Sequence, residues 1–242
     1  MTENMKPMRV RFAPSPTGRT HLGSGRTALY NYLLARQTGG QFILRIEDTD
    51  QKRYVAGAEE ELMQGLRWLG LQWDEGPDVG GDVGPYRQTE RRKFYDKYAR
   101  QLVEQGDAYY CFCAAKDEED ADDQPKKREQ HRDICPHRET PLAEADQKVA
   151  GGAPHVIRFR MPREGSTTVT DAIRGDITVE NSTLDDTVLV KTDGLPVYHL
   201  AVVIDDHLMK ITHAIRTSEW LPTFPLHGRL YEALGWEQPV WI

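Results

Sequence analysis

The stretch RFAPSPTGRTHLGSGRTALYNYLLAR, residues 11–36, places two prolines, three glycines and a histidine between a short apolar run and a segment of helical character. A strand that ends in such a turn and leads into a helix points the unpaired N–H groups of the helix at the space above the sheet, where anions bind. Gly23 has no Cβ to obstruct a ligand there, and His21 can donate to a phosphate oxygen. The stretch therefore predicts a phosphate-binding turn, although His-Leu-Gly alone fits an ordinary turn with a surface histidine better.

Strand and helix patterns alternate through the first hundred residues. Residues 9–14 and 41–48 have strand character, and a helical pattern follows each of them. The first helix, 24–40, should bury Ala28, Leu29, Tyr32, Leu33 and Ala35 and end at Gly39, and the second, 56–70, should bury Leu62, Leu66 and Leu69 and end at Gly70. This β-α-β-α order predicts a parallel sheet.

In the rest of the chain a highly charged segment interrupts the apolar strand and helix patterns, which then resume. A helix is predicted at 88–105, with Phe94, Tyr98 and Leu102 on one stripe. Residues 111–139 are dense in charge, which indicates a loop or a small lobe ordered around a bound ion. Alternation at Ile157, Phe159 and Met161 predicts a half-exposed strand, and 187–191 also has strand character. A strand at 211–216 and a helix at 225–235 complete the pattern.

Composition limits the class of protein. A chain of 242 residues with 38% hydrophobic residues suits one large domain or a domain with an insert. The formal charge of −7 argues against general adhesion to nucleic acid, but a protein with this net charge can still have a local basic face. No apolar run reaches the roughly 18 residues of a membrane span, and the start MTENMKPMRVRF lacks the core of a signal peptide. We therefore expect a cytoplasmic protein without membrane contact, and a monomer.

Three cysteines and a histidine form a C-x-C and C-x-H pair of motifs: Cys111, Cys113, Cys135 and His137. The odd number of cysteines disfavours a disulfide framework, and the separation of the two motifs suits two short knuckles that close one tetrahedral zinc site. Four protein ligands leave no open position, so the zinc should be structural. Cysteines in an apolar core are the alternative, but the surrounding sequence is highly charged. His131 could replace His137.

The opening motif also resembles that of a known family. RFAPSPTGRTHLG is similar to the ATP-binding signature of bacterial-type glutamyl-tRNA synthetases, which are class I aminoacyl-tRNA synthetases, and HLGS at 21–24 stands for their His-Ile-Gly-His element. Further blocks follow in the family's order: GGQFILRIEDTDQKRYV, WLGLQWDEGPDVGGDVGPYRQTER, DGLPVYHLAVVIDDHLM and EWLPTFPLHGRLYEALGW. The resemblance therefore covers nearly the whole chain, and it favours the bacterial branch over the archaeal and eukaryotic enzymes.

The resemblance implies an α/β fold, a Rossmann-type parallel nucleotide-binding sheet split by an inserted α+β acceptor-binding domain. The expected parts are the first half of the catalytic domain at 1–100, the insert with its zinc site at 101–194, and the second half at 195–242. The implied reaction activates L-glutamate with ATP and Mg²⁺ to glutamyl-adenylate and transfers it to the 3′ end of tRNA(Glu). Partners would be glutamate, ATP and the acceptor end of tRNA. Some bacterial members carry zinc in the insert.

Site residues follow from the same resemblance. Arg11 and Tyr198 would bind the side-chain carboxylate of glutamate, Ala13, Ser15 and Glu47 its α-amino group, and Arg216 its α-carboxylate. An arginine fork matches a carboxylate in two parallel bonds and so favours it over an amide. His21 and Gly23 would contact the triphosphate and adenosine as catalytic residues, with Glu219 and Trp220 at the ribose and adenine. From the residues alone, Glu47 also fits a solvated strand end, and Tyr198 and Trp220 fit core positions. Asp205 and Asp206 fit a paired acidic turn better than a metal site.

Departures from the family leave other functions open. No Lys-Met-Ser-Lys-Ser-type loop or helical anticodon-binding region occurs within 1–242, so we expect an N-terminal fragment that binds substrates and catalyses poorly. Ser218 stands where the family usually has an acidic residue, and Val202 stands where some members have a polar residue near the substrate side chain; both changes affect fine selectivity. One alternative is the paralogue that glutamylates queuosine on tRNA(Asp). The other is a non-catalytic module that binds nucleotide or tRNA.

Overall fold

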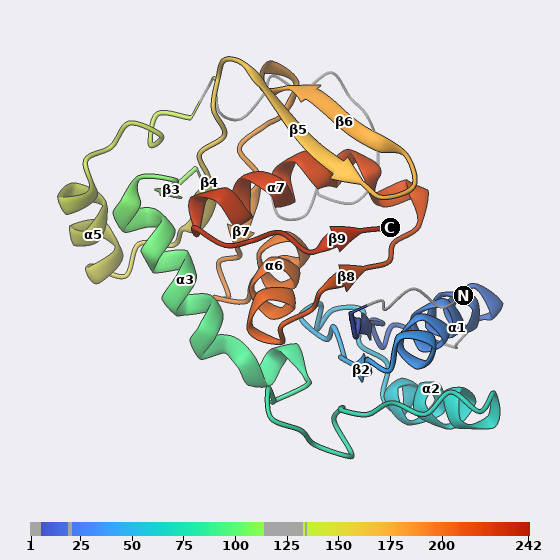
Figure 1. The fold of residues 1–242 in the computed structure, drawn as a ribbon. Coiled ribbons are helices and arrows are strands. Elements are labelled where there is room, and N and C mark those ends of the chain that lie inside the picture. The colour runs from blue at the N-terminus through green and yellow to red at the C-terminus, as the bar shows by residue number, and fades with distance from the viewer. Residues whose placement is uncertain (1–5, 19–20, 114–132, 134) are drawn as a thin grey trace.

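A computed structural model describes residues 6–18, 21–113, 133 and 135–242 (Figure 1). Its first elements are β1 (Arg9–Phe12), α1 (Leu22–Thr38), β2 (Gln41–Leu44), α2 (Ala58–Trp68), the 3-10 helix η1 (Gln88–Arg91) and α3 (Arg92–Gln105). The middle elements are β3 (Ala108–Cys111), α5 (Leu142–Ala150), β4 (Val156–Phe159), β5 (Ser166–Asp171), β6 (Gly175–Glu180), η3 (Asn181–Thr183) and β7 (Val188–Val190). The last are α6 (Tyr198–Leu208), β8 (His213–Ala214), η4 (Ser218–Thr223), α7 (Phe224–Ala233) and β9 (Val240–Trp241). The predicted β-α-β-α opening is confirmed.

Backbone hydrogen bonds join the first and last strands of the chain. β1 pairs with β2 in parallel, and on its other side the N–H of Thr212 donates to the carbonyl of Arg9 at 2.9 Å. β8 pairs in parallel with β9, and Glu75 forms a parallel bridge with Ile43 of β2. The order Glu75 segment, β2, β1, β8, β9 is that of a doubly wound sheet, and it changes direction between β1 and β8. Ligands bind at the carboxyl ends of strands beside such a switch point.

The two faces of β1 and β2 differ in polarity because side chains alternate along a strand. One face contributes Val10, Phe12, Phe42, Leu44 and Ile46 to an apolar core shared with α1 and α2. On the other face, Arg9 donates to the carbonyl of Met209, while Arg11 and Arg45 donate to Asp206 of α6. The sheet therefore buries arginines under α6, directly beside the switch point.

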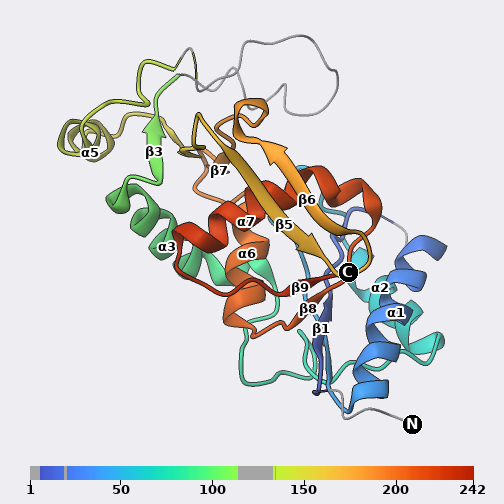
Figure 2. The ribbon, with the colours of Figure 1, turned by 45° about the horizontal axis from the view of Figure 1, so that its top comes forward.

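A second core joins the centre of the chain to its C-terminal part. β3, β4 and β7 form an antiparallel sheet, and the β5–β6 hairpin lies over α7 (Figure 2). One cluster of buried apolar side chains includes Tyr95 of α3, Phe159 of β4, Val169 of β5, Leu200 of α6 and Trp241 of β9. The fold is a mixed α/β arrangement. The expected domain boundaries at 100 and 194 stay predictions, and both fall within segments that share this core.

Several packing predictions were wrong. Leu29 and Leu33 are 40% and 51% exposed, because α1 buries a stripe of small or polar residues at Gly25, Ala28, Asn31, Ala35 and Thr38 instead. Leu69 is also exposed, and β4 is buried on both faces, because Ile157 and Phe159 pack into the second core while Val156 packs against Cys111 and Cys135. The predicted helix ends are confirmed by the left-handed φ angles of Gly39 (65°) and Gly70 (77°).

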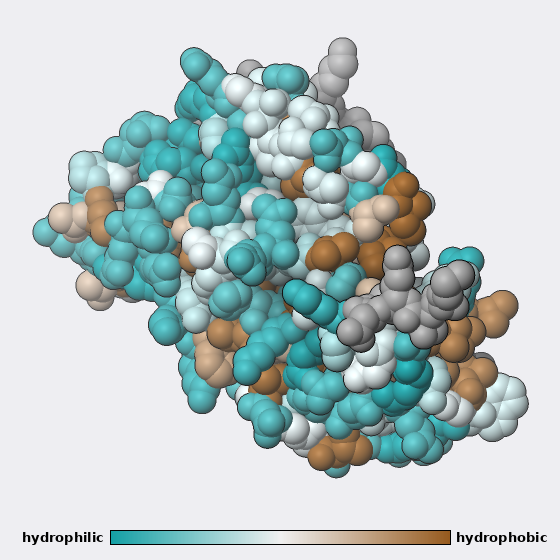
Figure 3. All heavy atoms as spheres, viewed as in Figure 1, coloured by the Kyte–Doolittle hydropathy of each residue, from teal (hydrophilic) through white to brown (hydrophobic). Residues whose placement is uncertain are grey.

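Apolar surface gathers over α1 and α2, on the right of Figure 3. Its members are exposed leucines that face away from the first core: Leu22, Leu29, Leu33 and Leu69. Within the described ranges, no helix has both the length and the apolar character needed to cross a membrane.

Candidate active site and metal cluster

Charged side chains from four segments meet beside the switch point. Arg11 comes from β1, Glu47 from the segment after β2, Asp206 from α6 and Arg216 from the segment after β8. Asp206 accepts from Nε of Arg11 at 2.9 Å and from Nη1 of Arg45 at 2.8 Å. Burial alone would raise the pKa of Asp206, but Arg11, Arg45 and Arg216 lower it to about 2. We call these residues, together with Asp205 and Arg91, the arginine cluster.

Asp205 completes the buried half of the arginine cluster. Its carboxylate accepts from Arg91 Nε at 2.6 Å, Gln88 at 2.9 Å and the Tyr95 hydroxyl at 2.9 Å. Both aspartates lie in the last turn of α6, where the helix dipole disfavours anions. The arginines offset that cost, so the expected pairing of Asp205 and Asp206 is confirmed, in a helix instead of a turn.

Glu47, which the resemblance assigned to the ammonium group of the substrate, lies beside the turn that precedes α1. Its backbone N–H donates to the carbonyl of Pro14 at 2.9 Å, which brings it next to the turn of Ala13 and Ser15. Burial raises the pKa of the Glu47 carboxyl, while Arg45, Arg11 and Arg216 act in the opposite direction. The carboxylate accepts from Arg45 Nη2 at 3.3 Å, and this single long bond leaves capacity for a further donor.

Arg216 has partners along one edge of its guanidinium, while Nε on the other edge is buried without one among the described residues. Its Nη1 donates to the hydroxyl of Tyr198 at 2.8 Å and meets Nδ1 of His227 at 3.2 Å. Its Nε is buried, and no acceptor from the described part of the chain reaches it. The ring of Tyr198 packs on Trp220 with centroids 4.5 Å apart. The structure therefore brings together five of the predicted site residues: Arg11, Glu47, Tyr198, Arg216 and Trp220.

The charge of the arginine cluster selects a kind of ligand. Four arginines face three carboxylates: Arg11, Arg45, Arg91 and Arg216 against Glu47, Asp205 and Asp206. One positive charge is in excess, and a buried charge needs a partner. A ligand with one net negative charge, carrying both carboxylate and ammonium groups, would complete the set.

His21 and Gly23 lie at the start of α1, beside a separate cavity. The His21 ring covers Gly23 so closely that a Cβ on Gly23 would lie 3.1 Å from it. A cavity of about 330 Å³ opens next to this turn and is lined by Pro14, Ser15, Pro16, Thr17, Gly18, His21, Ser24, Ala58 and Leu62. Ser15 belongs to this wall and follows the Pro14 carbonyl that binds Glu47, so the cavity and the arginine cluster share one loop. Glu219 is exposed and accepts from the Thr217 hydroxyl at 2.7 Å.

Sequence reasoning missed Arg45, His199 and His227, and it considered Asp205 and Asp206 but left both out of the site. A signal existed for the aspartates, since two acidic residues inside the apolar run AVVIDDHLM must be paired if that run is buried. No comparable local pattern marks His227. Val202, which was expected near the substrate side chain, is buried in the second core.

Cys111, Cys113, Cys135 and His137 form the predicted cluster, and we call them the cysteine cluster. Their ligand atoms lie within 4.8 Å of one another. The Cys111–Cys135 and Cys113–Cys135 sulfur distances are 3.6 and 3.7 Å, and Nδ1 of His137 is 3.3 Å from Sγ of Cys113. A tetrahedral ion bound to sulfur and nitrogen would separate these atoms by about 3.5–3.8 Å. The four residues therefore fit a metal ion; His131 lies outside the described residues.

The surroundings of the cysteine cluster correct one expectation. Cys111 and Cys135 are buried in a small apolar group with Tyr109 and Val156, although the nearby sequence is highly charged. The contact with Cys135 and burial raise the pKa of Cys111, and burial raises the pKa of Cys113. The thiols thus keep their protons unless a cation replaces them.

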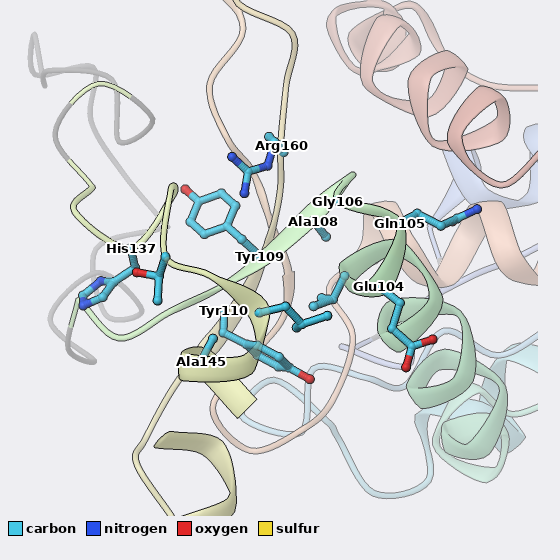
Figure 4. Close-up of a pocket in the computed structure, with 12 residues that line it drawn as sticks. Glu104, Gln105, Gly106, Ala108, Tyr109, Tyr110, His137, Ala145 and Arg160 are labelled. Carbon is cyan, nitrogen blue, oxygen red and sulfur yellow. The ribbon is translucent and has the colours of Figure 1, made fainter. Parts of the chain in front are cut away.

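A second hollow, of about 210 Å³, lies between the end of α3, β3 and α5. Figure 4 shows Tyr109 and Arg160 side by side at one edge, with the Arg160 guanidinium 5.3 Å from the ring centre, and Glu104 and Gln105 at the other. His137 lies at the far side from Gln105 (Figure 4). No residue of the arginine cluster lines this hollow.

Comparison with known proteins identifies the family. The model of the catalytic domain of class I tRNA synthetases (E and Q) matches residues 7–242. The chain belongs to this family. Among class I synthetases, a glutamate–tRNA ligase from Fusobacterium nucleatum is 50% identical over 98% of this chain and 47% of its own length. One from Clostridium botulinum is 52% identical over 97% of this chain and 49% of its own length.

Solved structures of class I synthetases agree. The crystal structure of a glutamate tRNA ligase from Elizabethkingia meningosepticum in complex with its amino acid has a TM-score of 0.88 and 48% identity, covering 98% of this chain and 49% of that one. A glutamate–tRNA synthetase from Elizabethkingia anophelis has a TM-score of 0.87 at the same identity. The chain spans about half the length of the curated relatives it matches.

Proposed function

We propose that this chain carries the glutamate-activating site of a glutamate–tRNA ligase. The reaction would join L-glutamate to ATP as glutamyl-adenylate, with release of pyrophosphate, and then transfer glutamate to the 3′ end of tRNA(Glu), with release of AMP. The names of the relatives support this activity over the queuosine-modifying and non-catalytic alternatives.

The excess positive charge of the arginine cluster carries the proposal. Glutamate has two carboxylates and one ammonium group and so one net negative charge, whereas glutamine has none. Arg11 uses Nε for Asp206 at 2.9 Å and Nη1 for the Ile215 carbonyl at 3.4 Å. Its Nη2 has no acceptor among the described residues, and it would donate to the side-chain carboxylate. The amide N–H groups of glutamine would instead face donors, which leaves buried polar groups unpaired.

The remaining roles follow from position. Glu47 would accept from the substrate ammonium, with Ala13 and Ser15 beside it, and Arg216 would bind the α-carboxylate through the edge whose Nε lacks a partner within the described ranges. The α-carboxylate itself attacks the α-phosphorus, so no side-chain nucleophile is required and alignment of two anions is the main task. His21 and Gly23 would hold the phosphates and adenosine at the α1 turn, with Trp220 and Glu219 at the adenine and ribose. Mg²⁺, when bound with ATP, would neutralise phosphate charge.

The middle of the chain would serve the acceptor end of tRNA. We assign residues 101–194 to an acceptor-binding insert and the cysteine cluster to a structural Zn²⁺ ion, because four protein ligands at tetrahedral spacing leave no position for substrate. The halves at 1–100 and 195–242 would form the nucleotide-binding part. Zinc would hold β3 to the segment around His137.

Calorimetry with the chain and paired amino acids tests the proposal. Glutamate should bind at least 10-fold more tightly than glutamine, and a non-hydrolysable glutamyl-adenylate analogue should bind more tightly than either, because it joins the two halves of the site. Equal affinity for glutamate and glutamine would contradict the assignment of Arg11. If the folded chain bound neither the analogue nor ATP, the proposed function would fail as a whole.

A further inference from the structure

Two buried histidines form a chain of contacts that ends at Arg216. His227, the fourth residue of α7, is 1% exposed, and its Nδ1 lies 3.2 Å from Nη1 of Arg216. Its Nε2 lies 3.0 Å from Nδ1 of His199, the second residue of α6. The contacts therefore join α7, α6 and the segment after β8 at one guanidinium.

The donor chemistry fixes the proton on each ring. A guanidinium can only donate, so Nδ1 of His227 accepts and its proton is on Nε2. Nε2 then donates to Nδ1 of His199, which leaves the His199 proton on its own Nε2. Burial and the charge of Arg216 lower the pKa of His199 to about 4 and that of His227 well below its usual range. Both rings are therefore neutral acceptors at physiological pH.

These contacts decide which edge of Arg216 is free. Nη1 is used twice, by His227 and by the Tyr198 hydroxyl at 2.8 Å. The opposite edge, Nε and Nη2, is the pair that binds a carboxylate in two parallel bonds. Along that edge, Nε has no acceptor in the described part of the chain, and Asp206 is 3.8 Å from Nη2.

We propose that His227, held in its tautomer by His199, is a positioning residue that turns the Nε–Nη2 edge of Arg216 toward the substrate's α-carboxylate. This inference rests on the proposed function, which places that carboxylate at Arg216. Without the acceptor at His227, the guanidinium can rotate to shorten its contact with Asp206, and the carboxylate-binding edge would turn with it. Asp206 is ionised at neutral pH and lies 3.8 Å from Nη2, so it attracts the released guanidinium.

Two near-isosteric variants separate the two contacts of His227. In His227→Asn the amide oxygen lies near the position of Nδ1, so the acceptor for Arg216 is kept and the contact with His199 is lost. In His227→Gln the amide reaches the position of Nε2, so the contact with His199 is kept and the acceptor is lost. Both bury one amide, and thermal unfolding measures whether both fold equally well. His155→Asn, at a half-buried histidine beside Tyr110, is the control.

Calorimetry should show that His227→Gln raises the Kd for glutamate about 10-fold, while His227→Asn and the control stay within about threefold of wild type. The Kd for ATP should change less than twofold in all of them. Equal Kd values for glutamate in the Gln and Asn variants would overturn the proposal. A wild-type chain that bound no glutamate would refute the proposed function instead. In that case ¹⁵N NMR of the Arg216 side chain still decides: Nη1 keeps Tyr198 as an acceptor in both variants, so its rotation should be faster in His227→Gln than in His227→Asn, and equal rates would overturn the proposal.

Discussion

The arginine cluster and the cysteine cluster both concentrate polar groups in the interior, but they are completed in different ways. In the arginine cluster, opposite charges from β1, α6 and the segments after β2 and β8 contact one another directly, as in the 2.9 Å pair of Arg11 and Asp206. In the cysteine cluster, three thiols and an imidazole face each other at 3.3–4.0 Å without an opposite charge in the donor set. The fold alone assembles the first cluster, whereas we propose that the second requires a metal ion.

This difference predicts that the stability of each cluster depends on a different component. A cluster made of internal ion pairs loses stability when one partner is removed, because the remaining charge is buried alone. A thiol cluster loses stability when its ion is removed, even though no side chain has changed. Perturbation of one cluster should therefore leave the properties of the other intact.

Removal of the metal should have the largest effect. The isolated protein should contain about one equivalent of zinc, and Cys113→Ser should lose it, with rapid amide exchange in β3 and around His137. Zinc binding contributes about 10 kcal/mol in zinc-finger peptides, so the loss should exceed that of any single ion pair. Metal analysis and hydrogen exchange measure both results.

Two controls limit that interpretation. His155→Asn changes a histidine 5.9 Å from Phe112 that is outside the ligand set, and it should keep its zinc. Glutamate affinity should survive in Cys113→Ser as long as the arginine cluster stays folded. Zinc-free protein with unchanged exchange in β3 would mean that the cysteine cluster needs no ion, and the contrast between the clusters would disappear.

Replacement of Arg11 should have the next largest effect. Arg11→Gln should weaken glutamate binding by about 10²–10³-fold and reduce the preference over glutamine, because both the carboxylate partner and the pair with Asp206 are lost. Arg9→Gln is the matched control, since Arg9 lies two residues earlier on the same face of β1 and pairs with Glu75 at 2.7 Å. The control should lose stability but keep the ratio of the two affinities. A similar fall in that ratio for Arg9→Gln would show that the selectivity is not local to Arg11.

Acidification should have a smaller effect, and it acts on the histidines beside the arginine cluster. The folded pKa of His199 is about 4, below the usual 6.5, so the unfolded chain binds more protons between these two pH values. Stability from this group is therefore full above about pH 6.5 and is lost as the pH falls toward 4. At pH 5 the loss should be about 2 kcal/mol.

His199→Asn isolates that contribution, because it keeps an acceptor near Nδ1 and has no proton to gain. Denaturant unfolding at pH 7 and pH 5 should show a smaller difference for this variant than for wild type. His155→Asn should retain the wild-type difference. An unchanged difference in His199→Asn would assign the acid sensitivity to other groups, such as the ligands of the cysteine cluster.

Local features of the fold could be predicted from the sequence, and long-range partners could not. The β-α-β-α opening and the helix ends at Gly39 and Gly70 follow from patterns within about twenty residues. The cysteine cluster also has a local signal, because ligand spacing is read within two short motifs. In contrast, Arg11 and Asp206 are separated by 195 positions, and no sequence pattern near either residue predicts their contact.

The other source of error was the choice of which face of a helix or strand is buried. α1 buries Ala28 and Asn31 while Leu29 and Leu33 remain exposed, since small side chains allow the helix to approach β1 and β2 closely. The β5–β6 hairpin was not predicted, because β5 has threonines on both faces and Val169 is its only aliphatic residue, although exposed and buried positions alternate along it. Hydrophobicity alone therefore predicts the wrong buried face wherever side-chain size or hydrogen bonding decides the packing.

The smallest effect should distinguish a glycine that serves a ligand from one that does not. Gly23 and Gly65 both lie within helices, where alanine is favoured by up to about 1 kcal/mol. A Cβ on Gly65 would meet nothing within 4 Å, so Gly65→Ala should raise stability by about 0.5–1 kcal/mol and leave ATP binding unchanged. A Cβ on Gly23 would lie 3.1 Å from the His21 ring, which is exposed and can move by the few tenths of an ångström required. Gly23→Ala should therefore fold normally and yet bind ATP several-fold more weakly, because the new methyl group displaces His21 and occupies the approach to the backbone. Thermal unfolding and ATP calorimetry on the two variants measure this divergence, and equal ATP affinity in both would mean that Gly23 is conformational, like Gly65, and not part of a nucleotide site.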